Sequence, residues 1–290
     1  MKVNNNKISE ILYNKTIGIV SNGFVGSRLY KYIQQNYPKN RIIVLDRVNI
    51  KTVLTTTVFD YLFNCAGNTG DFRQKPFETI DSNLLLTRQL LEYAQIKEAL
   101  IYLSSTRIYG FTTEKNLVFD ENYIATENHL SSDFIYNGTK KLTETFLMNV
   151  QKDYKVIICR LSNLIGDYKT SDLDDSTYLK VLLRHKIENK SIIVKQNIYS
   201  SKDYILIEDA LRGIVQSAIY SKESNYFNIA SGRSYSLEEV LTYLEINYST
   251  ETTITQTLYS SISVQKAKTQ ISFQANSLVP FLQKNLLFSN

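Results

Sequence analysis

The sequence predicts an α/β fold, a doubly wound parallel sheet with helices on both faces, and three observations lead to it. Short apolar runs rich in branched and aromatic residues alternate with segments of helical periodicity. The stretch from Leu100 to Gly110, LIYLSSTRIYG, ends in hydroxyls, as a buried parallel strand does at its carboxyl edge. A strand, a glycine turn, a helix and a second strand follow one another near the amino terminus. Ligands bind at the carboxyl edge of such sheets, so Ser104, Ser105 and Thr106 are expected at the mouth of a crevice.

Length and composition exclude several classes of protein. A chain of 290 residues with 43% hydrophobic residues can bury a large core. The net charge of +5 comes from scattered Lys and Arg residues, so we expect no nucleic-acid partner, whereas a phosphate-bearing small ligand suits it. No run approaches the roughly 18 apolar residues of a membrane span, and the start lacks a signal peptide, so a soluble cytoplasmic protein is expected. Cys65 and Cys159 lie in apolar runs without metal-ligand spacing, and no metal site is expected.

The glycine turn of the first unit, TIGIVSNGFVGSRL, indicates dinucleotide binding. Gly23 and Gly26 occupy the second and third glycine positions of GxGxxG, and Ser21 replaces the first. Gly23 would let the backbone approach a pyrophosphate at the helix amino terminus, and Gly26 would let the helix pack on the strand. Asp46 ends the next strand and could accept hydrogen bonds from ribose hydroxyls, which favours NAD, while the adjacent Arg47 leaves NADP open.

Further strands and helices follow in alternation. The patterns predict a strand over 58–68 that ends in small residues, a helix over 76–97, a helix over 134–150, a strand over 155–167, and strand-helix pairs over 202–219 and 226–244. Ser236 and Glu239 form a predicted capping box at the start of the last of these helices.

The helix over 134–150 contains Tyr136 and Lys140, and their i, i+4 spacing places both on one helix face. A lysine ammonium beside a phenol lowers the phenol's pKa, which would make the tyrosine usable as an acid or base. Tyr93 and Lys97 have the same spacing. Position separates the two pairs, because Tyr136 follows the hydroxyl-ended strand and opens its helix, whereas Tyr93 closes one.

Taken in order, these motifs resemble the extended short-chain dehydrogenase/reductase family, in particular its NAD-dependent epimerase/dehydratase group, which acts mostly on nucleotide sugars. The resemblance covers residues 16–244 and consists of eight ordered blocks: GFVGSRL, NCAG, SNLLLTRQLLEYA, SSTRIYG, YNGTK, RLSNLIGD, KDYILIEDA and FNIASG. It implies a Rossmann-type dinucleotide-binding domain over 1–166, with a return segment near 190–220, and a smaller substrate-binding region over 167–290. It also implies NAD or NADP as cofactor, a nucleotide-sugar substrate, and a homodimer formed through the helices at about 80–97 and 136–150.

The resemblance also implies roles for individual residues. Ser105 would hydrogen-bond the reacting hydroxyl or carbonyl, Tyr136 would be the acid/base, and Lys140 would bind the nicotinamide ribose and hold down the phenol's pKa. Asn163 would contact the substrate's diphosphate, and Lys202 stands where the family usually has a phosphate-binding arginine. The implied cofactor site comprises Ser21, Asn22, Gly23, Phe24, Val25, Gly26, Asp46, Arg47, Cys65, Ala66, Gly67 and Asn83 with Tyr136 and Lys140, and the substrate site adds Thr106 and Arg107.

Departures from the family pattern narrow the expected reaction. The family's TGxxGxxG is shortened around Ser21, and only 20 residues separate Asp46 from Ala66, so the unit between them is trimmed. Sugar 4,6-dehydratases carry Asp-Glu after the serine, whereas this chain has Thr106 and Arg107, so water elimination is not expected.

The expected reaction is therefore hydride transfer at a sugar carbon. The protein would be a ketoreductase if the cofactor exchanges, or an epimerase if an oxidised cofactor stays bound. The short chain favours a reductase, and Asp46, through NAD, favours an epimerase. The alternatives are a non-catalytic NAD(P)-binding sensor of the same fold and a sugar-nucleotide 6-dehydrogenase, which would need a suitably placed catalytic cysteine.

Overall fold

The computed structural model describes residues 5–68, 72–125, 130–131, 133–150, 152–166, 178–251 and 253–283. Its main strands are β1 (Thr16–Val20), β2 (Arg41–Leu45), β3 (Val58–Asn64), β4 (Gln95–Ser105), β6 (Lys155–Leu161) and β10 (Asn225–Ile229). The shorter strands are β5 (Val118–Phe119), β7 (Asn163–Ile165), β8 (Ile192–Val194), β9 (Ser201–Leu206), β11 (Ser234–Ser236), β12 (Tyr248–Thr250) and β13 (Ser261–Ile262).

The α-helices are α1 (Asn5–Ile11), α2 (Phe24–Asn36), α3 (Ile50–Thr56), α4 (Pro76–Ile80), α5 (Leu86–Tyr93), α6 (Phe134–Asn149), α7 (Tyr178–Ile187), α8 (Ile207–Tyr220), α9 (Leu237–Tyr243), α10 (Gln265–Gln270) and α11 (Val279–Gln283). A π-helical segment, η1 (Asp81–Leu85), joins α4 to α5, and a 3₁₀ turn, η2 (Thr106–Tyr109), follows β4. Among the described helices, none is both long and apolar enough to cross a lipid bilayer.

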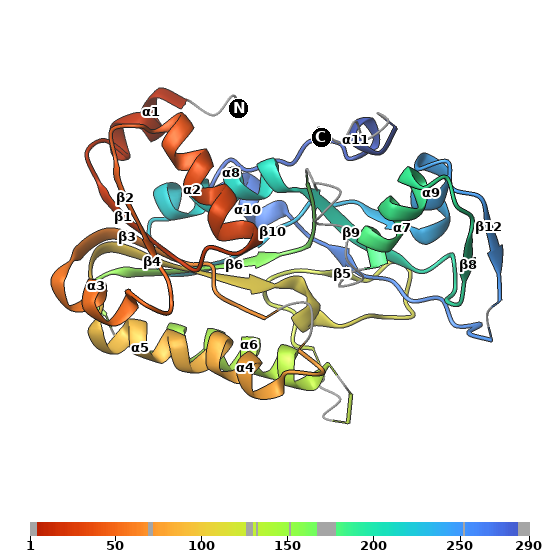
Figure 1. Ribbon diagram of the computed structural model, residues 1–290, viewed down its shortest axis with the longest axis horizontal. Coiled ribbons are helices and arrows are strands. Elements are labelled where there is room, and N and C mark those ends of the chain that lie inside the picture. Colours follow the sequence, from red (N-terminus) through yellow and green to blue (C-terminus); the bar gives the residue numbers. More distant parts are fainter. Residues whose placement is uncertain are drawn as a thin grey trace.

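A six-stranded sheet in the order β10-β6-β4-β3-β1-β2 forms the centre of the molecule, and all of its strand pairs are parallel (Figure 1). Helices α1, α2, α8 and α10 lie on one face, and α3, α4, α5 and α6 lie on the other. Strands buried on both faces need continuous apolar runs, which explains why β3 and β4 read as such in the sequence. The predicted doubly wound α/β fold is confirmed.

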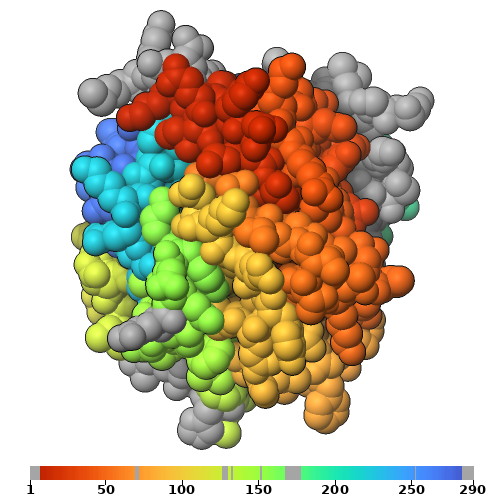
Figure 2. All heavy atoms as spheres, turned by 90° about the vertical axis from the view of Figure 1, so that its left-hand side faces the viewer, coloured from red at the N-terminus to blue at the C-terminus, as the bar shows by residue number. Residues whose placement is uncertain are grey.

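The strand order reverses beside β1, because β2 lies on one side of it and β3 on the other. The loops at the carboxyl ends of these strands diverge there and leave room for a ligand. Figure 2 views the molecule from the side opposite to the carboxyl ends of the strands. On this side, segments of the amino-terminal part of the chain, red to amber, pack closely beside green and cyan ones.

The helical region after Pro76 is shorter than predicted. It ends at Tyr93, because Ala94 is already extended and β4 begins at Gln95. There Ile96 pairs with Phe59 of β3, so pairing along the sheet overrides the helical periodicity. Lys97 therefore belongs to β4, and the predicted helical pair of Tyr93 and Lys97 is wrong.

Smaller sheets lie beyond the carboxyl edge of the large sheet. They have the orders β11-β9-β7, β12-β8 and β13-β5 (Figure 1). Residues of β7, β8, β9 and β11 share a core with α7 and α9, whereas Phe119 of β5 and Ile262 of β13 pack against η2. The capping box predicted at the start of α9 is confirmed, since Ser236 and Glu239 each accept a main-chain hydrogen bond from the other. The large sheet takes one of its two edge strands, β10, from residues 225–229. The domain division after residue 166 stays a prediction.

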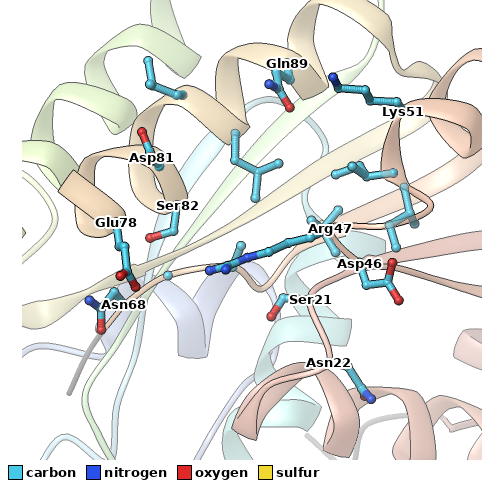
Figure 3. A pocket seen from close by; sticks show the side chains of 17 residues that line it. Ser21, Asn22, Asp46, Arg47, Lys51, Asn68, Glu78, Asp81, Ser82 and Gln89 are labelled. Carbon is cyan, nitrogen blue, oxygen red and sulfur yellow. The ribbon is translucent and has the colours of Figure 1, made fainter. Parts of the chain in front are cut away.

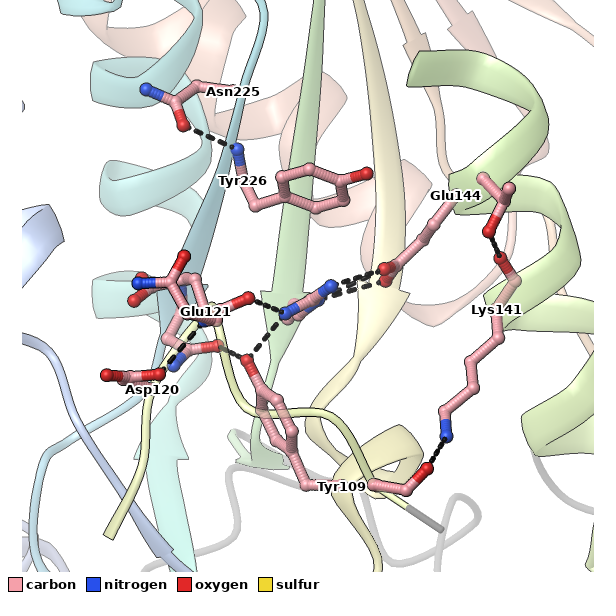
Figure 4. A network of polar contacts seen from close by, with 12 residues as sticks. Tyr109, Asp120, Glu121, Lys141, Glu144, Asn225 and Tyr226 are labelled. Atoms are coloured by element: carbon pink, nitrogen blue, oxygen red, sulfur yellow. Dashed lines mark hydrogen bonds and ion pairs between the residues drawn. The ribbon is translucent and has the colours of Figure 1, made fainter. Parts of the chain in front are cut away.

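A buried ion pair links the sheet to α6. Arg160 of β6 donates to both carboxylate oxygens of Glu144 on α6, with the shortest contact at 2.7 Å. Its Nη1 also donates to the hydroxyl of Tyr109 at 2.8 Å, and that hydroxyl donates to Asn228 at 2.7 Å (Figure 4). The network fixes the end of η2 against β6, β10 and α6, so the backbone that carries Ser105 is held from several directions.

Candidate active site

A cavity of about 740 Å³ opens at the carboxyl ends of β1, β2 and β3, where the strand order reverses (Figure 3). This volume lies within the range of small-molecule and cofactor pockets. The turns after the three strands and residues of α3, α4, η1 and α5 line it. The predicted cofactor residues that line the cavity are Ser21, Asn22, Asp46, Arg47, Ala66 and Gly67. The other predicted cofactor residues are not part of this lining: Gly23, Phe24, Val25, Gly26, Cys65, Asn83, Tyr136 and Lys140.

The turn after β1 has an unusual backbone conformation. Ser21 stands where the first glycine is expected, and its φ of 80° lies in the left-handed region that favours glycine. Its Oγ accepts a hydrogen bond from the N–H of Gly23 at 3.3 Å. A Cβ at position 26 would collide with the carbonyl oxygen of Ser21, so Gly26 provides the close packing of helix on strand that the motif requires.

Asp46 and Arg47 follow β2 and lie on the rim of the cavity. One carboxylate oxygen of Asp46, Oδ1, accepts the N–H groups of Val48 and Asn49, each at 2.9 Å. Within the described ranges, Oδ2 accepts no hydrogen bond and remains available to a ligand. The Arg47 side chain extends across the cavity toward the wall that carries Ser82 (Figure 3).

Gly67 separates the cavity from two buried polar side chains. A Cβ built at Gly67 would come within 3.1 Å of Asn83 Oδ1 and 3.2 Å of Lys140 Nζ. The amide nitrogen of Asn83 donates to Thr139 at 3.0 Å, but in the part of the chain that is described its Oδ1 is buried without a hydrogen-bond partner. Buried polar atoms are normally paired, so this oxygen indicates a donor that a ligand would supply.

Lys140 is almost completely buried on α6. Its Nζ donates to the carbonyl oxygen of Leu103 at 2.8 Å and lies 4.6 Å from the centre of the Tyr102 ring. Burial lowers the pKa of the ammonium to about 8, and the negative charge of Glu144, one turn further along α6, opposes that shift.

Ser105 and Tyr136 meet at the end of β4. The Ser105 side chain lies close enough to the phenol to lower its pKa, and Ser105 Oγ accepts the N–H of Arg107 at 3.2 Å. The phenol is buried against Phe72, with 5.1 Å between ring centres. The structure thus brings together two of the three predicted catalytic side chains, and Lys140 lies one turn further along the same helix.

The pKa of Tyr136 differs from the expectation. Burial raises the pKa of the phenol above its ordinary value, while the hydrogen bond with Ser105 and the positive charge of Arg107 lower it. The effects that lower the pKa therefore come from the turn after β4 rather than from Lys140, whose Nζ is directed to Leu103.

Two predicted substrate residues lie in this region. Arg107 is beside the ring of Tyr136, and Lys202 is near Arg107. Arg107 donates to Asp133 at 2.6 Å, and its guanidinium carbon is 5.3 Å from the centre of the Tyr136 ring. Burial lowers the pKa of Lys202, Arg107 lowers it further and Asp133 raises it, which places these charges near one another. In the described ranges the Lys202 ammonium forms no ion pair, and it lies 5.5 Å from the centre of the Phe111 ring.

Thr106 and Asn163 differ in exposure. Thr106 is buried in η2, whereas Asn163 is exposed at the start of β7 and donates to the carbonyl oxygen of Asp203 at 2.8 Å. No group of three or more His, Cys, Asp or Glu side chains with the arrangement of a metal site occurs in the residues searched, which are the described ones.

Sequence reasoning missed three residues that shape this region, Phe72, Asp133 and Asp203. Asp133 is the residue before α6, and its carboxylate accepts from both Arg73 and Arg107. Asp203 is buried, and it accepts the N–H groups of Ser231 and Gly232 at 2.9 and 2.8 Å. Asp203 lay in the recognised block KDYILIEDA, but no spacing rule connects it to a turn 28 residues away.

The described residues fit a dinucleotide cofactor. The turn of Ser21, Asn22 and Gly23 leads into α2, whose amino terminus presents a positive helix end to a pyrophosphate. The free oxygen of Asp46 suits a ribose hydroxyl, and the unpaired Asn83 Oδ1 suits a donor at the inner end.

Comparison with known proteins agrees with this arrangement. Residues 21–230 match the NAD dependent epimerase/dehydratase family. The chain is 28% identical over 208 residues to dTDP-4-dehydro-6-deoxyglucose reductase of Escherichia coli, across 70% of this chain and 60% of that protein. It is 20% identical over 244 residues to UDP-glucuronic acid decarboxylase 6 of Arabidopsis thaliana, across 75% of this chain and 69% of that protein. The chain thus spans less than two thirds of the bacterial reductase.

Among solved structures, MoeE5 in complex with UDP-glucuronic acid and NAD superposes with a TM-score of 0.76 at 19% identity, over 95% of this chain and 98% of that one. RMD from Pseudomonas aeruginosa complexed with NADPH has a TM-score of 0.76 at 18% identity, over 94% and 98%. These likenesses show a shared fold. Because the family match covers well over half of the 290 residues, the chain belongs to the NAD dependent epimerase/dehydratase family.

Proposed function

We propose that this protein transfers a hydride at a sugar carbon of a nucleotide sugar, as a ketoreductase or an epimerase. The observation that carries the proposal is the proximity of Ser105 to the buried phenol of Tyr136, with Lys140 on the same helix reaching the Gly67 wall of the cavity. The E. coli relative is a reductase of a nucleotide-linked keto sugar, which is the same class of chemistry.

In the reducing direction, Tyr136 donates its phenolic proton to the carbonyl oxygen of the sugar, and Ser105 donates a hydrogen bond to the same oxygen. A nicotinamide cofactor, when bound, supplies the hydride to the carbonyl carbon. In the oxidising direction Tyr136 accepts the hydroxyl proton. Lys140 and Asn83 lie where they would hold the cofactor's inner ribose. Asn163 and Lys202 would contact the diphosphate of the substrate.

Water elimination is not part of the proposal. A 4,6-dehydratase needs an acid and a base beside its serine, and Thr106 and Arg107 stand at those positions. Arg107 is in addition paired with Asp133, so neither residue can exchange a proton with a departing hydroxyl near neutral pH.

We propose NAD(H) as the cofactor, because Asp46 presents a free carboxylate oxygen on the rim of the cavity and would repel a 2′-phosphate. Arg47 is the residue through which NADP(H) would bind instead. Titration of the protein with NADH and NADPH by calorimetry decides between them. Tighter binding of NADPH would contradict the assignment.

The activity is tested by incubating the purified protein with NADH or NADPH and a panel of nucleotide sugars and 4-keto sugars, while absorbance near 340 nm is followed. Stoichiometric loss of the reduced cofactor identifies a reductase, and a new sugar isomer without net loss identifies an epimerase. Tyr136→Phe should abolish turnover, and Tyr93→Phe, at an exposed position of α5, should not. Undiminished turnover by Tyr136→Phe would refute the catalytic assignment.

We also propose a homodimer through α4, α5 and α6. These helices pack side by side on one face of the sheet (Figure 1), and they and η1 expose Phe77, Leu85, Leu142 and Phe146. A second copy that covers these side chains would complete a four-helix contact. Sedimentation velocity should show a dimer that Phe77→Asp dissociates, while Ile193→Asp, on the exposed side of β8, leaves it intact.

A further inference from the structure

Arg107 lies against the aromatic pair that contains Tyr136. Its guanidinium carbon is 5.3 Å from the centre of the Tyr136 ring and 5.1 Å from that of Phe72. The hydrogen bond from its Nη2 to Asp133 Oδ2, at 2.6 Å, holds the guanidinium in this position. Because the Arg107 N–H also donates to Ser105 Oγ, its backbone is tied to the hydroxyl beside the phenol.

Lys140 is directed elsewhere. Its Nζ donates to Leu103, lies over the Tyr102 ring, and would nearly touch a Cβ at Gly67. The ammonium therefore faces the cofactor wall and the main chain of β4. Of the two cations, Arg107 is the one that contacts the ring of Tyr136.

We propose that Arg107 is a positioning residue that stabilises the phenolate form of Tyr136 and so sets the pH at which this phenol exchanges a proton with the substrate. The inference rests on the proposed role of Tyr136 as the acid/base. It gives a function to the residue that stands where dehydratases carry the glutamate of their Asp-Glu pair.

Within the described part of the chain, several other groups surround the phenol. Ser105 lies beside the phenol at the end of β4, and Asp133, before α6, partly offsets the charge of Arg107. The neighbouring titratable and charged groups on the other described elements are Arg73 beside Phe72, Lys202 on β9, Tyr102 on β4 and Lys140 on α6. Among these groups, Ser105 and Arg107 are the two that lower the pKa of Tyr136 against the effect of burial.

The expected size of the effect is modest. The Arg107 side chain keeps 39% of its surface exposed, so water screens part of its charge. A cation at this distance from the ring, in an environment between protein surface and water, shifts an ionisation by about 0.5 to 1 pH unit. The exposure also means that substitution of Arg107 should leave the core of the protein folded.

The test replaces Tyr136 with 3,5-difluorotyrosine, whose phenol ionises at lower pH than tyrosine and carries a unique ¹⁹F signal. Titration of that signal by NMR gives the ionisation midpoint of position 136 without any substrate. Arg107→Gln should raise the midpoint by about 0.5 to 1 unit. Arg107→Lys, which keeps the charge, should lie closer to the unsubstituted protein. Arg88→Gln, which removes an exposed arginine of α5, should not move the midpoint.

An unchanged or lowered midpoint in Arg107→Gln would overturn the inference, as would an equal rise in Arg88→Gln. The experiments distinguish a failure of this inference from a failure of the proposed function. If Tyr136→Phe stayed active while the midpoint still moved, the acid/base assignment would fail and the electrostatic coupling would stand. If Tyr136→Phe were inactive and the midpoint did not move, the role of Arg107 alone would fail.

Discussion

The Nζ of Lys140 donates a hydrogen bond to the carbonyl oxygen of Leu103 at 2.8 Å, across 37 residues of sequence. This contact anchors α6 to the central strand at the point where β4 turns into η2. It also keeps a charged group in a nearly water-free place behind the cavity wall. A buried ammonium at that position lowers the stability of the folded protein. The role of Lys140 in the proposed activity can therefore be tested separately from its effect on folding.

Lys140→Met should therefore be more stable than the unsubstituted protein at pH 7, by about 1 to 3 kcal/mol, while turnover is lost. The folded-state pKa of Lys140 is about 8, below its ordinary value of 10.5. Below pH 8 both states are protonated and the full cost applies. Between pH 8 and about 10.5 the unfolded state binds more protons, so the native protein regains stability as pH rises.

Urea unfolding at pH 7 and pH 10 measures this difference. The stability advantage of Lys140→Met should shrink at the higher pH. An advantage that is the same at both values would show that burial of the charge is not its cause.

Ser21→Gly should raise stability by about 0.5 kcal/mol, because the left-handed φ of 80° is strained for serine and natural for glycine. Ser272→Gly provides a matched control, since Ser272 is exposed outside the cavity lining and has a φ of 56°. Both variants should melt at higher temperature. Calorimetry with NADH should find altered affinity, if any, in Ser21→Gly alone. A lower melting temperature of Ser21→Gly would mean that its hydrogen bond with Gly23 outweighs the strain.

Gly26→Ala and Gly23→Ala should have different consequences. A methyl group at Gly26 meets the carbonyl oxygen of Ser21, so α2 has to move off β1, at a cost of about 3 kcal/mol. A methyl group at Gly23 meets nothing closer than Ser21 Oγ at 3.5 Å, an ordinary contact. Gly23→Ala should therefore fold normally but bind the cofactor more weakly. Equal melting temperatures for the two variants would contradict the packing argument.

Glu144→Gln should destabilise the protein by about 3 kcal/mol, because it leaves the buried guanidinium of Arg160 without a counter-charge. The double variant Glu144→Leu with Arg160→Met should recover much of that loss. The exposed pair of Arg88 and Glu92 has the same 2.7 Å separation, and its removal should cost far less stability than removal of the buried pair, because water screens its charges. A double-mutant cycle by urea unfolding measures both couplings. Similar values for the two pairs would show that burial does not set the strength.

Several parts of the fold and of the candidate site could be predicted from local patterns. Strands β1 to β4 can be recognised in the sequence as apolar runs, and the capping box of Ser236 and Glu239 depends on residues three apart. Gly26 was predictable because its role is to clear a backbone atom within the same turn. The end of the helix at Tyr93 could not be predicted in this way, because it is set by the pairing of Ile96 with Phe59 in the sheet.

The order of strands and helices, the glycine turn and the succession of Ser105, Tyr136 and Lys140 were set by the sequence alone, since each depends on neighbours within one or two turns of chain. The tertiary structure decided which charges meet. It directs Lys140 to Leu103, brings Asp133 to Arg107 from 26 residues away, and joins Asp203 to Ser231. Such pairings depend on how helices and strands pack in three dimensions, and spacing along the chain carries no information about that packing.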